Sequence, residues 1–223
     1  MARVLGLDLG SHSVKAVLFE TTLRSYQTKL AASVRRSQEG EKRETLKAAL
    51  NELLTHNPLQ ADLVVVAPPG QTLATHVVSL PFSDTKKIEQ ALPFEIEAQL
   101  PFDLDEVVYD YQVASSKEKK TDLLVGVARK EDVRALLDLL AEVKIDPRVI
   151  THPGLTYQNV LATMPAPESP DAAVAIVDIG HERTSVAIGV PGGVVEFART
   201  FSGGGRGLTR ALANEFQIPL PEA

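Results

Sequence analysis

The sequence predicts an α/β protein made of two related lobes that follow one another along the chain. Short apolar or alternating segments bounded by Gly or Pro predict strands, and they are interspersed with segments whose apolar residues have helical spacing. In addition, Val4–Gly10 (VLGLDLG) is matched about 170 residues later by Val174–Gly180 (VAIVDIG). In both places a short polar turn and a second alternating strand follow, which indicates an internal duplication.

The first lobe begins with a β-β-β-α-β order. Apolar or alternating residues predict strands over 3–9, 13–20 and 25–35. Leucines and alanines at helical spacing predict a helix over 41–55, which Asn57-Pro58 ends, and a further strand follows over 62–67.

The middle of the chain has a different pattern. We expect a helix over 83–99 that Pro93 kinks or splits, because proline cannot donate the helical hydrogen bond. Two strands, over 106–114 and 123–128, are expected on either side of a polar loop at 115–122. A further strand is expected before the helix, over 76–80.

An amphipathic helix over 130–144 comes next, with Val133, Leu136, Leu137 and Leu140 on one face. A strand starts at 149–150 and a helix is expected over 152–164. Three prolines in six residues make 165–170 (PAPESP) the predicted linker. Beyond the repeated strand pair we expect a strand over 194–200 and a helix near 208–216.

Composition excludes several classes of function. Among 223 residues there are 23 Lys and Arg and 29 Asp and Glu, a formal charge of −6, which argues against nucleic acid or an anionic membrane as the main partner. The absence of cysteine excludes disulfides and thiolate chemistry, and the five histidines lack metal-ligand spacing. The apolar stretches are far shorter than the ~20 residues that span a bilayer, and we expect a cytoplasmic protein.

The two Asp-x-Gly turns are the strongest chemical signal. Glycine permits a close approach of the backbone to a ligand, hydroxyls donate to phosphate oxygens, and carboxylates at strand ends hold Mg²⁺. A single Asp-x-Gly is more often only a tight turn, whereas two facing copies could grip the phosphates of one nucleotide. The candidate residues are Asp8, Gly10, Ser11, Ser13, Lys15, Asp178, Gly180 and Thr184, with Ser185 beside them.

These segments resemble the actin/Hsp70/sugar-kinase superfamily, whose RNase H-like halves each begin with such a phosphate hairpin. Within it the chain resembles the PilM/GspL branch, the actin-like components of type IV pilus and type II secretion machines. The segments that carry the likeness are 6–17 (GLDLGSHSVKAV), 92–111 (LPFEIEAQLPFDLDEVVYDY), 124–130 (LVGVARK), 177–185 and 203–211 (GGGRGLTRA).

The resemblance implies the domain organisation. Domain I spans 1–164 with a subdomain inserted at about 70–150, 165–170 is the linker, and 171–223 begins domain II. The superfamily's adenosine-contacting motif lies beyond the stretch where this chain stops, so the second lobe is expected to be incomplete. ATP and Mg²⁺ are the implied cofactors, with Mg²⁺ held through Asp8 and Asp178. His181, Glu182 and Arg183 depart from the small residues expected at the second turn.

An acidic segment is the second candidate site. Two Pro-Phe steps lie among carboxylates, so the segment is either a solvated face over core phenylalanines or a docking surface for a basic partner. The candidate residues are Phe94, Glu95, Glu97, Phe102, Asp103, Asp105 and Glu106. The basic pairs Arg35-Arg36 and Lys42-Arg43 are interpreted as solvated faces.

The sequence therefore favours a scaffold at the cytoplasmic face of the bacterial inner membrane, without catalytic residues. It would link a motor ATPase to the tail of an inner-membrane assembly-platform protein, and family members often self-associate. The alternatives are a nucleotide-hydrolysing or sugar-kinase-like enzyme of the same superfamily, which would need a catalytic Asp between the hairpins, and an FtsA-like filament former. Pilus and secretion machines are not distinguished.

Overall fold

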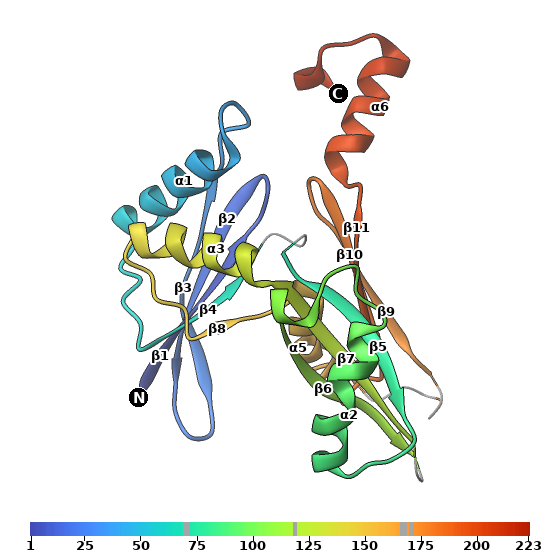
Figure 1. Ribbon diagram of the computed structural model, residues 1–223. Coiled ribbons are helices and arrows are strands. Elements are labelled where there is room, and N and C mark those ends of the chain that lie inside the picture. Colours follow the sequence, from blue (N-terminus) through green and yellow to red (C-terminus); the bar gives the residue numbers. More distant parts are fainter. Residues whose placement is uncertain (69–71, 118–119, 166–168, 170–171) are drawn as a thin grey trace.

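The computed structural model describes residues 1–68, 72–117, 120–165, 169 and 172–223. These residues form three sheets, one of five strands and two of three strands (Figure 1). Most of the predicted linker at 165–170 lies outside the described residues. No helix in the described part of the chain is long and apolar enough to cross a membrane.

The five-stranded sheet has the order β3-β2-β1-β4-β8. β1 (Ala2–Leu9) pairs antiparallel with β2 (Ser13–Thr21) and parallel with β4 (Leu63–Ala67). β3 (Tyr26–Arg35) and the two-residue β8 (Val149–Ile150) are the outer strands among the described residues. The predicted β-β-β-α-β order is confirmed.

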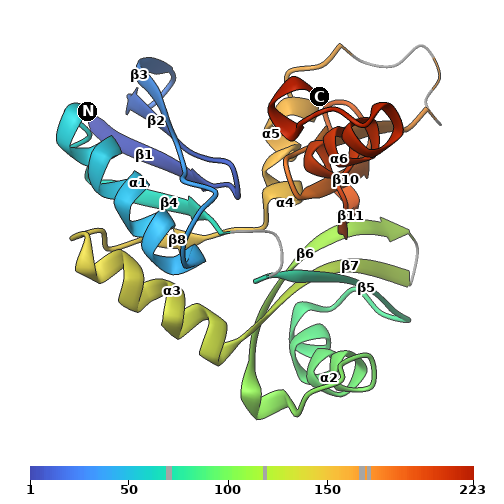
Figure 2. The same cartoon turned by 90° about the horizontal axis from the view of Figure 1, so that it is seen from above.

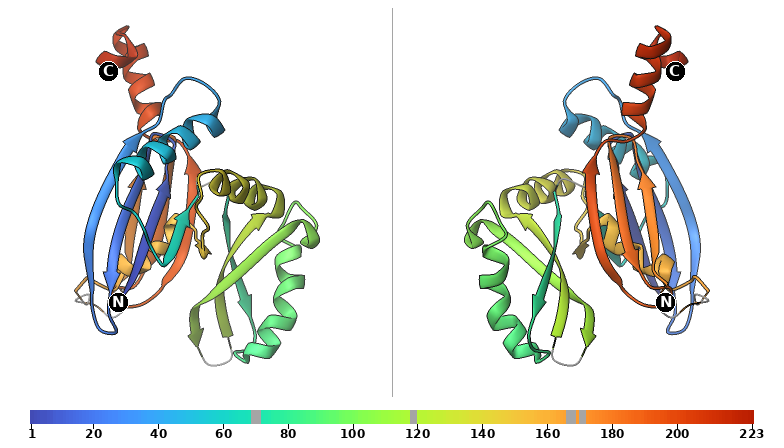
Figure 3. Two further views of the ribbon diagram at one scale, coloured as in Figure 1. Left: turned by 90° about the vertical axis from the view of Figure 1, so that its left-hand side faces the viewer. Right: turned by 90° about the vertical axis from the view of Figure 1, so that its right-hand side faces the viewer.

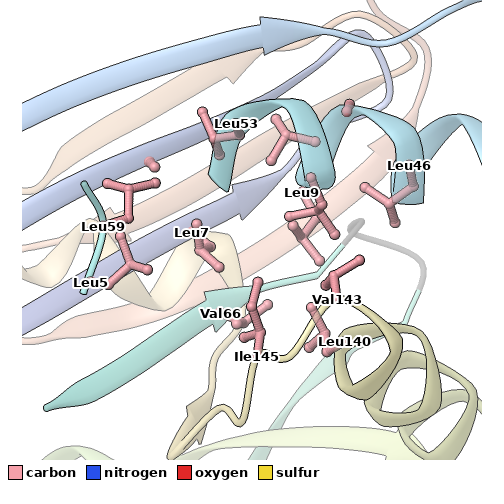
Figure 4. Packing of buried hydrophobic residues seen from close by; sticks show 14 of the residues in the cluster. Leu5, Leu7, Leu9, Leu46, Leu53, Leu59, Val66, Leu140, Val143 and Ile145 are labelled. Carbon is pink, nitrogen blue, oxygen red and sulfur yellow. The ribbon is translucent and has the colours of Figure 1, made fainter. Parts of the chain in front are cut away.

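Two helices, α1 (Lys42–His56) and α3 (Lys130–Glu142), cover one face of this sheet (Figure 2). Alternation in β1 points Leu5, Leu7 and Leu9 into that core, where leucines and valines of both helices and of β4 meet them (Figure 4). The same alternation places Gly6 and Asp8 on the opposite face. The predicted apolar face of α3 is partly wrong, because Leu139 is buried while Leu137 is exposed.

The first three-stranded sheet has the order β5-β7-β6, and we call it the inserted sheet because its strands fall between β4 and β8 along the chain. Its strands are β5 (Ala74–Leu80), β6 (Val107–Lys117) and β7 (Lys120–Arg129), and a short 3₁₀ turn at Leu104–Glu106 precedes β6. Residues Leu123, Val125 and Val127 of β7 pack against α2 (Thr85–Glu97). Asp84 caps α2 by accepting from the amide of Lys87 at 3.0 Å.

Two expectations for this unit need correction. Pro93 does not split α2, which runs as one helix through it. The polar stretch 115–122 is not a loop, because Ser115 and Ser116 pair with Asp122 and Thr121 in the β6–β7 ladder. Polar side chains suit the exposed end of a hairpin, and backbone pairing continues there whatever the side chains are. Residues 118 and 119 lie outside the described residues.

The second three-stranded sheet has the order β11-β10-β9, with β9 (Val174–Ile179), β10 (Arg183–Gly189) and β11 (Val195–Ser202). Its first two strands repeat the register of the first lobe: Asp178 faces Ser185 as Asp8 faces Lys15. α6 (Gly205–Phe216) and a 3₁₀ turn at Leu220–Glu222 follow. The predicted helix over 152–164 is instead two short ones, α4 (Pro153–Thr156) and α5 (Gln158–Leu161), divided at Tyr157.

The other face of the inserted sheet packs against the second lobe (Figure 3). Leu124 of β7 joins a buried cluster with Leu161, Ala187 and Val195. The side-chain amide of Gln112 donates to the carbonyl of Val195 at 2.8 Å, and the Thr75 hydroxyl donates to the carbonyl of Ala198. This contact fixes how the inserted sheet and the second lobe lie relative to each other.

Candidate functional site

The two Asp-x-Gly turns meet in space. The ring of His12, in the β1–β2 turn, lies 4.8 Å from the ring of His181, in the β9–β10 turn, centroid to centroid. Both rings line one cavity of about 140 Å³. Arg183, Ser185 and Thr200 line this cavity. So do seven of the eight predicted phosphate-site residues, namely Asp8, Gly10, Ser11, Ser13, Lys15, Asp178 and Gly180.

The first turn is held by close packing and by one buried cation. A Cβ on Gly10 would lie 2.7 Å from the carbonyl oxygen of Ser13, so only glycine fits without a shift. The Arg36 guanidinium donates to the carbonyls of Gly10 at 2.9 Å and Lys42 at 2.7 Å. Arg36 is buried, so its interpretation as a solvated residue is wrong. Nothing local in the sequence marks it, because its partners come from a turn and a helix.

The second turn is anchored on the Gly203–Gly205 segment. The amide of Gly205 donates to the carbonyl of Gly180, and the amide of Arg206 donates to the carbonyl of His181, both at 2.8 Å. A Cβ on Gly204 would lie 2.4 Å from the Gly180 oxygen. The run of glycines therefore lets α6 begin directly against the turn.

The charges of the second turn are partly compensated. Glu182 accepts from Arg206 at 2.7 Å and pairs with Lys42 of the first lobe at 3.5 Å. Burial opposes ionisation of Glu182, but the two cations still lower its pKa. Glu182 is therefore occupied by partners outside the cavity walls, while Arg183 lines the cavity.

The predicted magnesium carboxylates already have partners. Asp8 accepts from the Lys15 ammonium at 3.2 Å, and Asp178 accepts from the Tyr157 hydroxyl at 2.6 Å. Burial, and then the bond to Asp178, raise the pKa of Tyr157 above its usual range. Thr184 is directed elsewhere, since its hydroxyl donates to the carbonyl of Gly203 at 3.0 Å.

His152 lines a second cavity and is hydrogen-bonded to Thr200, a wall residue of the first. Its Nδ1 accepts from the amide of Gly154 at 3.0 Å, which leaves Nε2 to donate to the Thr200 hydroxyl at 3.3 Å. Thr200 in turn shares a 3.0 Å hydrogen bond with Ser185. Burial lowers the pKa of His152 to about 4, so the ring is neutral at physiological pH.

The donor set suits phosphate better than a bare metal ion. Lys15 and Arg183 supply charge and Ser11 and Ser13 supply hydroxyls at the cavity. Two buried ring nitrogens, Nδ1 of His12 and Nε2 of His181, have no hydrogen-bond partner. Within the described ranges, no group of three or more His, Asp or Glu is arranged to hold a metal ion.

The second cavity, of about 360 Å³, is a groove between the inserted sheet and the β8 end of the five-stranded sheet. Five consecutive residues of β6, Val108–Gln112, line it, and so do four consecutive residues, Val149–His152, at β8. Side chains of a strand alternate between faces, so consecutive lining residues mean that the strand edges themselves border the groove. In the described part of the chain, β6 and β8 are outermost strands of their sheets.

The acidic segment lies away from both cavities. Phe94 projects from α2 with 74% of its surface exposed. Phe102 is 39% exposed, and the Arg129 guanidinium lies over its ring at 5.2 Å. Neither phenylalanine is a core residue, so the interpretation of the two Pro-Phe steps as core is wrong. Glu95, Glu97, Asp103, Asp105 and Glu106 are exposed around them.

Comparison with known proteins identifies the family. The family described as type IV pilus assembly protein PilM matches residues 6–223. A chain of the PilM–PilN type IV pilus biogenesis complex is 25% identical, with a TM-score of 0.80 over 98% of this chain and 67% of that one. The cytoplasmic domain of EpsL, an inner-membrane component of the Vibrio cholerae type II secretion system, is 18% identical, with a TM-score of 0.58 over 95% of this chain and 75% of that one.

These matches confirm the resemblance and the actin-like fold. The likeness to EpsL is one of fold, whereas the family match extends over nearly the whole sequence. The chain belongs to the PilM family of type IV pilus assembly proteins.

Proposed function

We propose that this protein is a scaffold of a type IV pilus or type II secretion assembly platform, working at the cytoplasmic face of the inner membrane. Its task would be to hold the cytosolic tail of an inner-membrane protein of the PilN kind. The presence of PilN in the similar solved complex supports the choice of partner. A division into a first lobe at 1–164, an insert at about 70–150 and a second lobe from 171 is part of this proposal, and the three separate sheets support it.

The groove between two sheet edges is the observation that carries the proposal. An extended peptide placed there meets backbone donors and acceptors of β6 on one side and β8 on the other. Main-chain hydrogen bonds to a sheet edge give affinity, and side-chain pockets give specificity. Val108 and Leu155 offer apolar contacts, and Asp110 offers a carboxylate to a basic side chain.

A glycine in the groove provides a direct test. Gly126 of β7 lines the groove, and a Cβ there would make only an ordinary 3.9 Å contact with the Asp110 carbonyl. Gly126→Leu should therefore fill the groove without straining the backbone. Gly207 of α6 has open space at its Cβ position, so Gly207→Leu is the matched control.

The experiment measures binding of a fluorescent PilN-type tail peptide by anisotropy. Gly126→Leu should weaken binding at least about tenfold, a loss of about 1.4 kcal/mol, while Gly207→Leu should bind like the parent protein. Equal binding by all three proteins would place the tail elsewhere and refute the groove.

Two further elements belong to the same proposal. The cavity between the turns binds the phosphates of a nucleotide such as ATP, with Lys15, Ser11, Ser13 and Arg183 as the phosphate-contacting groups; Asp8 and Asp178 would bind Mg²⁺ after leaving Lys15 and Tyr157. The acidic segment around Phe94 and Phe102 binds a basic surface such as that of the motor ATPase. Steady ATP turnover that is lost in Asp8→Ala would instead favour the enzyme alternative.

A further inference from the structure

The two histidines in the turns are the least explained residues of the phosphate cavity. His12 is the last residue of the first turn and His181 is the middle residue of the second. Their rings contact each other across the two lobes, with centroids 4.8 Å apart at an angle of 43°. No other described aromatic pair joins the two lobes. The pair thus lies where the two turns meet at the cavity.

Their hydrogen bonding is incomplete. His12 Nδ1 and His181 Nε2 have almost no contact with solvent and no partner in the protein. An unpartnered buried polar atom costs about 1–3 kcal/mol, so such atoms call for an explanation, for instance an absent ligand. A neutral imidazole offers one donor and one acceptor, whereas a protonated ring offers two donors, which is what a phosphate oxygen needs.

We propose that His12 and His181 are phosphate-contacting residues, which take up protons when a di- or triphosphate enters the cavity and then donate to its oxygens. This rests on the proposed phosphate site and adds to it the residues that make binding depend on pH. Without the anion, protonating both rings would place two positive charges side by side, and their repulsion opposes this. With the anion, each new charge is attracted to it.

The surrounding charges are consistent with this behaviour. His181 faces Arg206 and Arg210 of α6, Glu182 of its own turn, and His12. Burial, and then the charges of His12 and Arg206, hold the pKa of His181 below its usual value. Lys15 and Asp8 from the first lobe, and Arg183 and Asp178 from the second, complete the charged walls, and Arg36 lies behind Gly10.

The variant that separates the histidines from the rest of the site is the double substitution His12→Gln with His181→Gln. Glutamine keeps a hydrogen-bond donor but cannot be protonated near neutral pH. His56→Gln is the matched control, because His56 is an exposed residue of α1 far along the chain from both turns. Circular dichroism checks that each variant is folded.

The measurement is calorimetric titration with pyrophosphate and, separately, with ATP, between pH 6.0 and 8.0 in two buffers of different ionisation enthalpy. We expect proton uptake on binding, and an affinity that rises up to about tenfold per pH unit per proton as the pH falls. The ligand titrates too, but identically for every variant, so the difference in slope belongs to the protein. The double variant should lose the proton uptake and the part of the pH dependence of affinity that exceeds the ligand's own, and His56→Gln should keep both.

Each outcome decides a separate claim. Binding with the same pH dependence in the parent protein and the double variant would overturn the role of the histidines and leave the phosphate site standing. No binding of either ligand at millimolar concentration would overturn the phosphate site and this inference together, without touching the groove. Equal affinity for both ligands would identify the diphosphate alone as the recognised group, and preference for ATP would identify the nucleotide.

Discussion

The hydroxyl of Tyr157 donates to a carboxylate oxygen of Asp178 at 2.6 Å. Asp178 is the counterpart of Asp8 in the duplicated hairpin, but Asp8 pairs with Lys15 of its own hairpin instead. The duplication is therefore preserved in register and not in side-chain partners. The second lobe's carboxylate is tied to the junction between α4 and α5, at the point where the helix breaks.

We predict that Tyr157→Phe lowers the free energy of unfolding by about 0.5–1.5 kcal/mol, the usual net value of one hydrogen bond. Asp178→Asn should cost less, because the amide oxygen still accepts from the hydroxyl. Urea denaturation measures both. A larger loss for Asp178→Asn than for Tyr157→Phe would show that the charge of Asp178, and not this bond, is what matters.

Arg36 should be a strong stability determinant of the first turn. Arg36→Met keeps the length of the side chain but removes the hydrogen bonds that the guanidinium donates to the carbonyls of Gly10 and Lys42, so we expect a loss of about 1–3 kcal/mol. The neighbouring Arg35 is exposed, and Arg35→Met should change stability by less than about 0.5 kcal/mol. Guanidinium denaturation of the two variants compares them, and equal effects would contradict the anchoring role of Arg36.

The glycine run before α6 gives a steric prediction. Gly204→Ala places a methyl 2.4 Å from the Gly180 oxygen, so the turn must shift, at a cost of about 1–3 kcal/mol. Gly207→Ala, three residues on, meets no neighbour and should stabilise the helix by up to about 1 kcal/mol. Thermal unfolding should therefore move in opposite directions for the two variants; a shared direction would mean that the tight contact at Gly204 is easily relieved.

We expect the buried, neutral His152 to make the folded protein less stable in mild acid. Its pKa is about 4 in the folded protein against an ordinary 6.5, so below pH 6.5 the unfolded chain binds a proton that the folded protein does not. The contribution of neutral His152 to the free energy of unfolding is complete above pH 6.5, and about 3 kcal/mol of it is lost as the pH falls to 4. His152→Asn can still accept from the amide of Gly154 but does not titrate. Its unfolding free energy should fall less between pH 7 and 4.5, and parallel profiles would show that His152 is not the titrating group.

Features set by neighbouring residues could be predicted from the sequence. Alternation and Gly or Pro boundaries located the strands of both lobes, and the repeated Asp-x-Gly located the two turns that meet at the cavity. Features set by distant partners could not. The burial of Arg36 depends on a turn 26 residues away, and the burial of Leu139 in place of Leu137 depends on the angle at which α3 meets the sheet.

The candidate site shows the same division. His181 was visible in the sequence as a departure from small residues at the second turn, whereas His12 was not noted, and the contact between positions 12 and 181 is a property of the folded lobes. The groove borders were not predictable, since they depend on which strands lie at the edges of two different sheets. The pairing that turned the expected loop at 115–122 into a hairpin likewise depends on backbone hydrogen bonds, which side-chain polarity does not reveal.

The central claim, that an extended tail binds between β6 and β8, is tested most directly by hydrogen–deuterium exchange with and without a PilN-type tail peptide. Free edge amides exchange quickly, and a bound strand protects them. The account predicts slower exchange in peptides covering Val107–Gln112 and Val149–His152, and unchanged exchange in β3, the far edge of the five-stranded sheet. Saturating peptide that leaves both groove edges unprotected, or protects only other surfaces, would contradict it.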